Sequence, residues 1–228
     1  MDKFVTPKFR ENTTNNIYKY QYFFDFDDKV YYTKSNSDLT KQIFKKWNIV
    51  RKNRHPKPAE LKNLAGDLSE EYFYNSATNI NIDYIESFLT KQLENICDKK
   101  IDNLSFESKN HDGQTTKDLW VNYQHQYEHN PLHKHSGIFS FVWYLDIPEE
   151  IRQEHHNQTS NSETRGMLSF QSSRSSENLI FNPKTTDVLI FKSDHRHQVY
   201  PFYTHNTRVS MAGNIHTITF EDGETITA

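Results

Sequence analysis

Residues 129–148 of this chain read HNPLHKHSGIFSFVWYLDIP, and this stretch decides the fold. Its second half, Ile138 to Ile147, is almost entirely apolar or aromatic, which predicts a β-strand that is buried on both faces. Its first half places His133 and His135 two positions apart. Because side chains alternate between the two faces of a strand, this spacing predicts that both imidazoles point the same way and can bind one metal ion together.

Further short strands are predicted on both sides of this stretch. Each is a run of apolar or aromatic residues that polar, turn-forming residues separate from the next. They are Leu119 to Tyr123, Met167 to Gln171, Asn178 to Phe181, Val188 to Phe191, Gln198 to Phe202 and Arg208 to Ile218. Many short strands of this kind indicate a barrel or a sandwich. The long polar segment Glu149 to Arg165 predicts a mobile surface loop.

The N-terminal half predicts a mixture of strands and helices. Aromatic residues alternate between Ile17 and Thr33, which suits strands. A helix is expected to begin at Ser37 or Asp38. A stronger helix begins at Asp83, because the apolar positions that follow it recur with the 3.6-residue period.

The composition indicates a folded protein with an aromatic core. Only 34% of the 228 residues are hydrophobic and the mean hydropathy is -0.90, but 14% are aromatic, so aromatic rings must build much of the interior. The net charge of -3 gives no indication of binding to nucleic acid or to an acidic membrane. The length fits one compact domain, in which we expect an α+β supporting region at 1–114 and a β core at 115–228.

The cysteine content and the apolar segments bear on the compartment. Cys97 is the single cysteine, so no intrachain disulfide forms and a reducing compartment is favoured. The N-terminus has no apolar run of signal-peptide length, and no stretch approaches the ~20 apolar residues of a membrane span. We therefore expect a soluble, cytoplasmic protein.

His197 is the preferred candidate for a third metal ligand. If its side chain faces the interior, so does that of the apolar Val199, while the polar Gln198 faces outward. His195 has the same parity and is the rival candidate, but it lies nearer the predicted turn at 193–194. Three protein ligands that leave positions open on the metal suit a catalytic iron.

Arg208 is a candidate for binding an acidic cosubstrate. It follows His197 by eleven residues, enough for a strand end, a turn and a returning strand. Ser210 then shares its face of the strand. A buried arginine requires an anionic partner, and a dicarboxylate would supply one.

These segments resemble the iron(II)/2-oxoglutarate-dependent oxygenases over roughly residues 60 to 217. The segments that carry the likeness are Trp120 to Tyr123, Tyr127 to Pro148, Val188 to Ser193, His197 to Phe202 and Arg208 to Asn214. The last three are similar to the F-P-S, H-x-V-x-P-F and R-x-S-x-x-x-N motifs of that superfamily, with Lys192 in place of the proline. The chain looks closest to members from marine phages and cyanobacteria, and a viral chain would act in the host cytoplasm. The resemblance implies a double-stranded β-helix of the jelly-roll or cupin-like type, with helices of the N-terminal half packed on one side.

The resemblance also implies roles for individual residues. His133 and His197 would bind Fe(II). Arg208 would bind the distal carboxylate of 2-oxoglutarate, assisted by Ser210. Three more residues would contact or line the cosubstrate pocket, unless they are simply packed within the barrel: Tyr123, Tyr144 and Asn214.

His135 departs from the family pattern, because it stands where the superfamily has Asp or Glu. We favour His135 as the third metal ligand, since strand geometry puts it in the place of the carboxylate. Water or Asp194 could fill that position instead. A set of three histidines leaves the full +2 charge of the ion uncompensated.

The resemblance implies a dioxygenase that uses O2 and converts 2-oxoglutarate into succinate and CO2 while it hydroxylates a substrate. The spacing from Tyr123 to His133 is similar to that of prolyl hydroxylases, which favours a peptide or protein substrate. Two alternatives remain open. One is a three-histidine, cupin-like dioxygenase that does not use 2-oxoglutarate, and the other is a non-catalytic barrel module.

Overall fold

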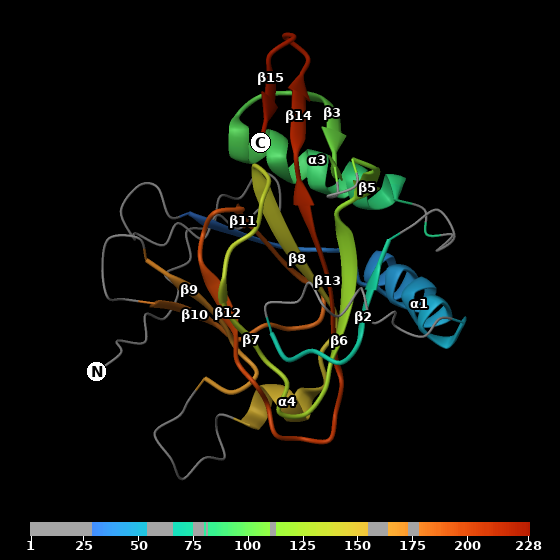
Figure 1. Ribbon diagram of the computed structural model, residues 1–228, viewed down its shortest axis with the longest axis vertical. Helices are drawn as coiled ribbons and strands as arrows, with labels where there is room; N and C mark the ends of the chain where they lie inside the picture. The colour runs from blue at the N-terminus through green and yellow to red at the C-terminus, as the bar shows by residue number, and fades with distance from the viewer. Residues whose placement is uncertain are drawn as a thin grey trace.

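The computed structural model describes residues 29–53, 66–74, 80, 82–109, 113–154, 164–172 and 178–228. Most of its strands form two sheets, in which all strand pairs are antiparallel (Figure 1). The six-stranded sheet contains, in spatial order, β1 (Val30–Lys34), β11 (Asp187–Lys192), β8 (Phe139–Asp146), β13 (Arg208–Ile215), β6 (Leu119–Gln124) and β2 (Glu71–Phe73). The four-stranded sheet contains β10 (Asn178–Phe181), β9 (Leu168–Gln171), β12 (His197–Val199) and β7 (Asn130–His133).

The other described strands form a three-stranded sheet and a separate pair, and helices accompany the sheets. The C-terminal hairpin and a strand from the first half of the chain form a three-stranded sheet of β15 (Thr225–Thr227), β14 (Thr217–Phe220) and β3 (Ile101–Ser105). A separate pair consists of β4 (Glu107–Lys109) and β5 (Thr115–Lys117). The described helices are α1 (Ser37–Asn53), α3 (Asp83–Cys97) and the short α4 (Glu149–Gln153). None of the helices in the described ranges is long and apolar enough to cross a membrane.

The six-stranded sheet separates two apolar clusters, because its side chains alternate between the faces. On β8, Phe141 and Trp143 belong to the larger cluster, which also contains the buried faces of α1 and α3. Tyr144 points the other way, into a smaller cluster with Leu168 and Phe170 of the four-stranded sheet. The predicted burial of this strand on both faces is therefore confirmed, and the space between the two sheets lies on the face opposite the helices.

Several predicted elements are confirmed. Helix α1 begins at Ser37 and α3 at Asp83, and β10 covers the predicted residues 178–181. The alternating region from Ile17 to Thr33 is described only from residue 29 onward, where β1 occupies Val30–Lys34. Strands from both sides of residue 114 share sheets, because β1 pairs with β11, β2 with β6 and β3 with β14. The supporting region expected at 1–114 thus contributes strands to the same sheets as the residues that follow it.

Two predicted strands differ from the structure. The expected strand Arg208 to Ile218 is divided into β13 and β14 at His216, whose N–H donates to the carbonyl of Ser105 at 2.9 Å, where the chain passes to the three-stranded sheet. Strand β12 ends at Val199 instead of Phe202. Pro201 has no N–H to donate to a ladder, so the predicted continuation of β12 is wrong.

The segment from Glu149 to Arg165 is not wholly a loop. Its first five residues form α4, whose Ile151 is 1% exposed. A Cβ on Gly166 would lie 2.8 Å from Cγ2 of Ile151, and Gly166 has φ +69°. Ile151 is buried because it packs against the backbone at Gly166, and this close packing leaves no room for a larger side chain at position 166. Residues 155–163 lie outside the described part of the chain, so the expected mobility of the segment stays a prediction.

The C-terminal end of α3 offers a test of backbone strain. Asp98 has φ 55° and ψ 36°, and its N–H donates to the carbonyl of Glu94. In this left-handed conformation a Cβ costs roughly 1 kcal/mol that glycine avoids. Because Asp98 is exposed, we expect Asp98→Gly to raise the free energy of unfolding by about 0.5–1 kcal/mol in chemical denaturation. Asp98→Ala should not raise it, and equal stabilisation by both variants would contradict this account.

Candidate metal and cosubstrate site

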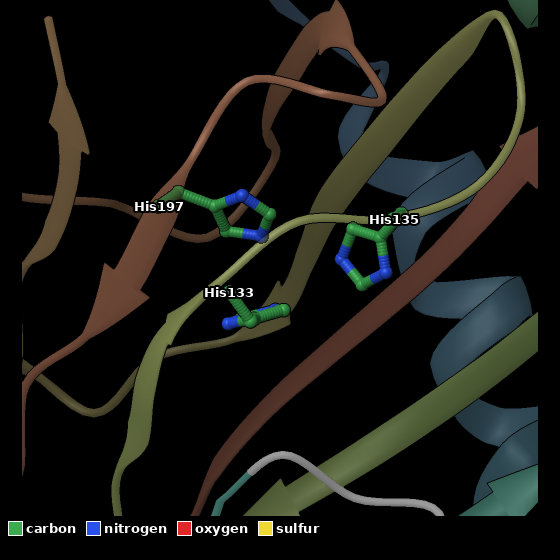
Figure 2. A group of neighbouring side chains, drawn as sticks. All are labelled: His133, His135 and His197. Carbon is green, nitrogen blue, oxygen red and sulfur yellow. The ribbon is translucent and has the colours of Figure 1, made fainter. Parts of the chain in front are cut away.

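Three histidines converge between the two sheets (Figure 2). His133 at the end of β7 and His197 at the start of β12 are register partners, and their ring centroids lie 4.3 Å apart. The ring of His135 lies 4.9 Å from that of His133 and 5.0 Å from that of His197. One ring nitrogen from each residue lies within 4.8 Å of the other two. Metal–imidazole bonds are about 2.1 Å long, so small side-chain rotations would bring all three nitrogens to one ion.

His135 reaches this cluster although β7 ends at His133. Its backbone N–H donates to the carbonyl of Ser193 at 2.8 Å, which holds the chain in place beyond the strand. The next turn contains Gly137 with φ +110°, where a Cβ would approach the carbonyl oxygen of Ile215 to 3.0 Å. The expectation that both histidines lie on one strand is thus wrong in detail, but the two imidazoles do meet.

Backbone carbonyls fix the orientation of two of the rings. Nδ1 of His133 lies 2.7 Å from the carbonyl oxygen of Pro131, and Nδ1 of His197 lies 3.0 Å from that of His195. A carbonyl only accepts, so each Nδ1 carries the proton and each Nε2 carries the lone pair. The amide Nδ2 of Asn130, a donor, lies 3.3 Å from Nε2 of His133, which agrees with this tautomer. Such backbone bonds commonly orient metal-binding histidines.

Burial favours the neutral form of all three imidazoles. Desolvation is the main cause that lowers the pKa of His133, and it lowers the pKa of His135 to about 4, with a further contribution from His133. Desolvation also lowers the pKa of His197 well below its ordinary value. At neutral pH the three rings are therefore uncharged, which is the state in which imidazole binds a metal.

His195 and Asp194, the alternative ligands, lie outside this cluster. The ring of His195 packs 5.2 Å from that of Phe170, and its Nε2 lies 3.2 Å from the carbonyl oxygen of Gln171. Asp194 is exposed. The histidines that come together are thus His133, His135 and His197.

Arg208 is a buried cation with neutral partners. It is the first residue of β13 and is 3% exposed. Its Nη1 donates to the carbonyl of Gly166 at 2.6 Å and its Nη2 donates to Oε1 of Gln124, while its Nε has no hydrogen-bond partner. Within the described ranges, no carboxylate forms an ion pair with it, and burial lowers the pKa of the guanidinium. A buried cation with an unused donor fits an anionic ligand.

Ser210 and Tyr144 lie on the same face of the six-stranded sheet as Arg208, and their contact with a cosubstrate stays a prediction. Val209 and Met211 belong to the cluster under the helices, so Arg208 and Ser210 face the space between the sheets. Ser210 and Tyr144 are register partners on adjacent strands. Burial raises the pKa of the Tyr144 hydroxyl, and the positive charge of Arg208 opposes that shift.

Tyr123 does not reach this space. Its ring packs edge-on at 5.8 Å against Tyr72, its hydroxyl donates to Oδ1 of Asn48 at 3.1 Å, and the guanidinium of Arg51 lies 4.4 Å from its ring centroid. The reason is strand parity, because Tyr123 points toward the helices and Gln124 points inward. The geometry does not support the expected contact of Tyr123 with a cosubstrate, and it reveals Gln124 as the residue that was missed.

Asn214 belongs to a different part of the barrel. It follows Arg208 by six residues on β13, which corresponds to about 20 Å along a strand. Its Oδ1 accepts from the Ser140 hydroxyl at 2.6 Å and its Nδ2 donates to Asp118 at 2.7 Å. Asp118 also lies 3.0 Å from Nε2 of His216. Both ends of the amide are used in this network, so Asn214 connects strands and does not line the pocket around Arg208.

Comparison with known proteins agrees with this geometry. A family model described as "Putative 2OG-Fe(II) oxygenase" matches residues 118–214, which include the three histidines and Arg208. No curated protein sequence matches the chain. The likeness to marine phages and cyanobacteria stays a prediction.

Two solved structures have a similar fold. One is a prolyl-4-hydroxylase from Pseudomonas putida, with a TM-score of 0.55 and 11% identity over 82% of this chain and 91% of that chain. The other is a prolyl hydroxylase from Trichoplax adhaerens in complex with a hypoxia inducible factor oxygen degradation domain peptide fragment, with a TM-score of 0.50 and 13% identity over 79% of this chain and 81% of that one. The expected double-stranded β-helix is thus confirmed. Residues 118–214, which carry the candidate site, are thus similar in sequence to the family described as 2OG-Fe(II) oxygenases.

Proposed function

We propose that this protein is an Fe(II)- and 2-oxoglutarate-dependent hydroxylase. His133, His135 and His197 would bind the iron, and Arg208 would bind the distal carboxylate of the cosubstrate with Ser210 and Tyr144 beside it. The observation that carries the proposal is the state of Arg208. This cation is buried with neutral partners and an unused Nε donor, on the face of the sheet that looks toward the histidine cluster.

The residues of the chain would prepare the site in three ways. His133 and His197 present Nε2 lone pairs that backbone carbonyls have already oriented. Phe191 packs at 4.8 Å and Phe170 at 5.7 Å from the ring of His197, which keeps water away from that ligand. Arg208 would orient the cosubstrate by a charge-assisted contact at its far end. Bound iron would supply the activation of O2 that couples the conversion of 2-oxoglutarate into succinate and CO2 to hydroxylation of the substrate.

A peptide or protein is the proposed substrate. The support comes from the fold, which is shared with prolyl hydroxylases, one of them in complex with a peptide fragment. A panel of proline-containing peptides tests this part separately. A peptide substrate should increase the rate of succinate formation and gain one oxygen atom, which mass spectrometry detects. If only small metabolites increased the rate of succinate formation, the peptide assignment would be wrong, but the use of 2-oxoglutarate as cosubstrate would still stand.

The test of the function is turnover of the cosubstrate. Protein reconstituted with Fe(II) without oxygen and then exposed to O2 should form succinate from 2-oxoglutarate. Among the described residues, the histidine cluster contains no carboxylate. This favours one competing function, a three-histidine dioxygenase that binds its substrate directly to iron. Addition of 2-oxoglutarate should change the visible absorption of the Fe(II) protein only under the proposed function. If the Fe(II) protein neither binds 2-oxoglutarate nor forms succinate, the proposal is wrong.

The role of His135 can be tested with two substitutions. If His135 is a ligand, His135→Ala should weaken Mn(II) or Fe(II) binding at least about tenfold. His135→Asp should retain binding, because a carboxylate can occupy the same position and also compensates part of the charge of the ion. Isothermal titration calorimetry measures both affinities.

The control for this pair is Asp194→Ala, since Asp194 is exposed and should not affect metal affinity. Unchanged affinity in His135→Ala would instead support water in the third position. Loss of affinity in Asp194→Ala would assign that position to Asp194.

A further inference from the structure

We infer that Gln124 is a positioning residue: its neutral side-chain oxygen orients Arg208 and leaves the positive charge of the guanidinium available for the cosubstrate. This inference rests on the proposed function. Gln124 is the last residue of β6, is 3% exposed and is the register partner of Arg208 across the strand pair. No sequence motif marks it, and its neighbour Tyr123 is the residue that the family resemblance favoured.

The amide of Gln124 has a defined orientation. Its Nε2 donates to the carbonyl of Glu128 at 2.5 Å and, at 3.4 Å, to the carbonyl of Tyr200. Both partners can only accept, so the nitrogen must face them and Oε1 must face Nη2 of Arg208. The carbonyls of Glu128, after β6, and Tyr200, after β12, thus fix the orientation of the amide. The amide oxygen in turn fixes the guanidinium of Arg208.

Both described acceptors of the Arg208 guanidinium are uncharged. Gln124 provides an amide oxygen and Gly166 a backbone carbonyl. The nearby acidic side chain of Glu128 points elsewhere, because its carboxylate accepts from the backbone N–H groups of Ser69 at 3.0 Å and His125 at 2.8 Å. A carboxylate in place of the Gln124 amide would neutralise Arg208 from within the chain. It would also repel the anionic end of a dicarboxylate ligand in a site that screens charge poorly.

The position of Gln124 therefore predicts how substitutions act on ligands of different charge. Gln124→Glu preserves the shape of the side chain but adds a negative charge. Gln124→Met removes the acceptor and adds no charge. A residue that merely supports the loop would affect all ligands of the site alike, whereas a residue that acts through Arg208 should affect the distal carboxylate alone.

The experiment uses the full chain loaded with Mn(II), which does not require turnover. Calorimetry measures the affinity for 2-oxoglutarate and for 2-oxopentanoate, which has the same carbon chain but a methyl group in place of the distal carboxylate. Gln124→Glu should weaken 2-oxoglutarate on the order of a hundredfold. Gln124→Met should weaken it about tenfold or less. Mn(II) affinity and the affinity for 2-oxopentanoate should stay within about twofold of wild type in both variants, since neither involves the charge of Arg208.

The outcomes separate this inference from the proposed function. A wild-type protein that binds Mn(II) but not 2-oxoglutarate would overturn the proposed function, and the inference with it. Tight 2-oxoglutarate binding in both the wild type and Gln124→Glu would overturn the role of Gln124 alone. Equal weakening of both acids, or loss of Mn(II) binding, would assign Gln124 a purely structural role. If Gln124→Glu fails to fold, Gln124→Met provides the test. It should weaken 2-oxoglutarate binding more than 2-oxopentanoate binding, and an equal effect on both acids would overturn the role of Gln124.

Discussion

His197→Ala is expected to abolish tight binding of Fe(II) or Mn(II), with a loss of affinity greater than about 100-fold. The expectation follows from the position of this ring. His197 is 5% exposed, its Nδ1 lies 3.0 Å from the backbone carbonyl of His195, and one of its ring nitrogens lies within 4.8 Å of those of His133 and His135. Loss of residues that only orient a ligand costs 10- to 100-fold in metal affinity, so loss of a ligand should cost more. Calorimetric titration of Mn(II) into the apo-protein measures the effect.

His195→Ala is the matched control for this prediction. His195 lies two residues away, has the same parity on the chain and is 7% exposed, but its ring packs against Phe170 outside the cluster. This variant should bind Mn(II) like the wild type. A comparable loss in both variants would indicate that the local fold, and not ligation, accounts for the effect. Loss of Mn(II) affinity in His195→Ala alone would identify His195, and not His197, as a metal ligand.

Strand parity allowed much of the site to be predicted from the sequence. The i, i+2 rule requires only that a segment be extended, and it correctly placed Arg208 and Ser210 on one face of β13. It did not separate His197 from His195, which has the same parity; the position of His195 nearer the predicted turn favoured His197, whose ring contacts those of His133 and His135. These predictions depend on neighbouring residues alone, which is why they could be made without a structure.

The same reasoning could not identify which residue of β6 faces Arg208. That depends on the register between β6 and β13, which pairs Arg208 with Gln124 across 84 positions of sequence. A shift of one residue in register exchanges the two faces of a strand, and it would exchange Tyr123 for Gln124. The apolar ring of Tyr123 packs under the helices beside Tyr72, a preference that becomes visible only when both clusters are known.

Asn214 and His135 show two other limits of prediction from sequence. Asn214 has the correct parity but lies about 20 Å along the strand from Arg208, so a shared face did not mean a shared pocket. His135 lies beyond the end of β7 and is held by a hydrogen bond to Ser193. The imidazole of His135 does meet that of His133, as predicted, but a common strand is not the reason. The hydrogen bond to Ser193 takes the place of regular strand geometry at His135.

The second large effect is expected at Arg208. Arg208→Met should weaken 2-oxoglutarate binding by about 100-fold or more, because truncating one partner of a buried charge pair costs 2–5 kcal/mol or more. The guanidinium is buried and its described partners are neutral, so none of these partners can replace its charge. Thermal unfolding gives a direct measurement. At a cosubstrate concentration of 100 times Kd, the wild type should gain about 2.7 kcal/mol of stability, and the variant should gain almost none.

Arg165→Met provides the control, because Arg165 is the neighbour of Gly166 but its guanidinium stacks 3.8 Å from the ring centroid of Tyr203. It removes a like charge next to the Gly166 acceptor of Arg208 without removing the proposed carboxylate partner, so the stabilisation by 2-oxoglutarate should persist. If both variants lose it, general electrostatic attraction accounts for binding. If Arg208→Met retains it, Arg208 is not the cosubstrate residue, and the three-histidine dioxygenase that does not use 2-oxoglutarate is still contradicted, because the protein binds this acid. Only loss in Arg208→Met with retention in Arg165→Met supports the buried, neutrally held guanidinium as the group that selects a dicarboxylate.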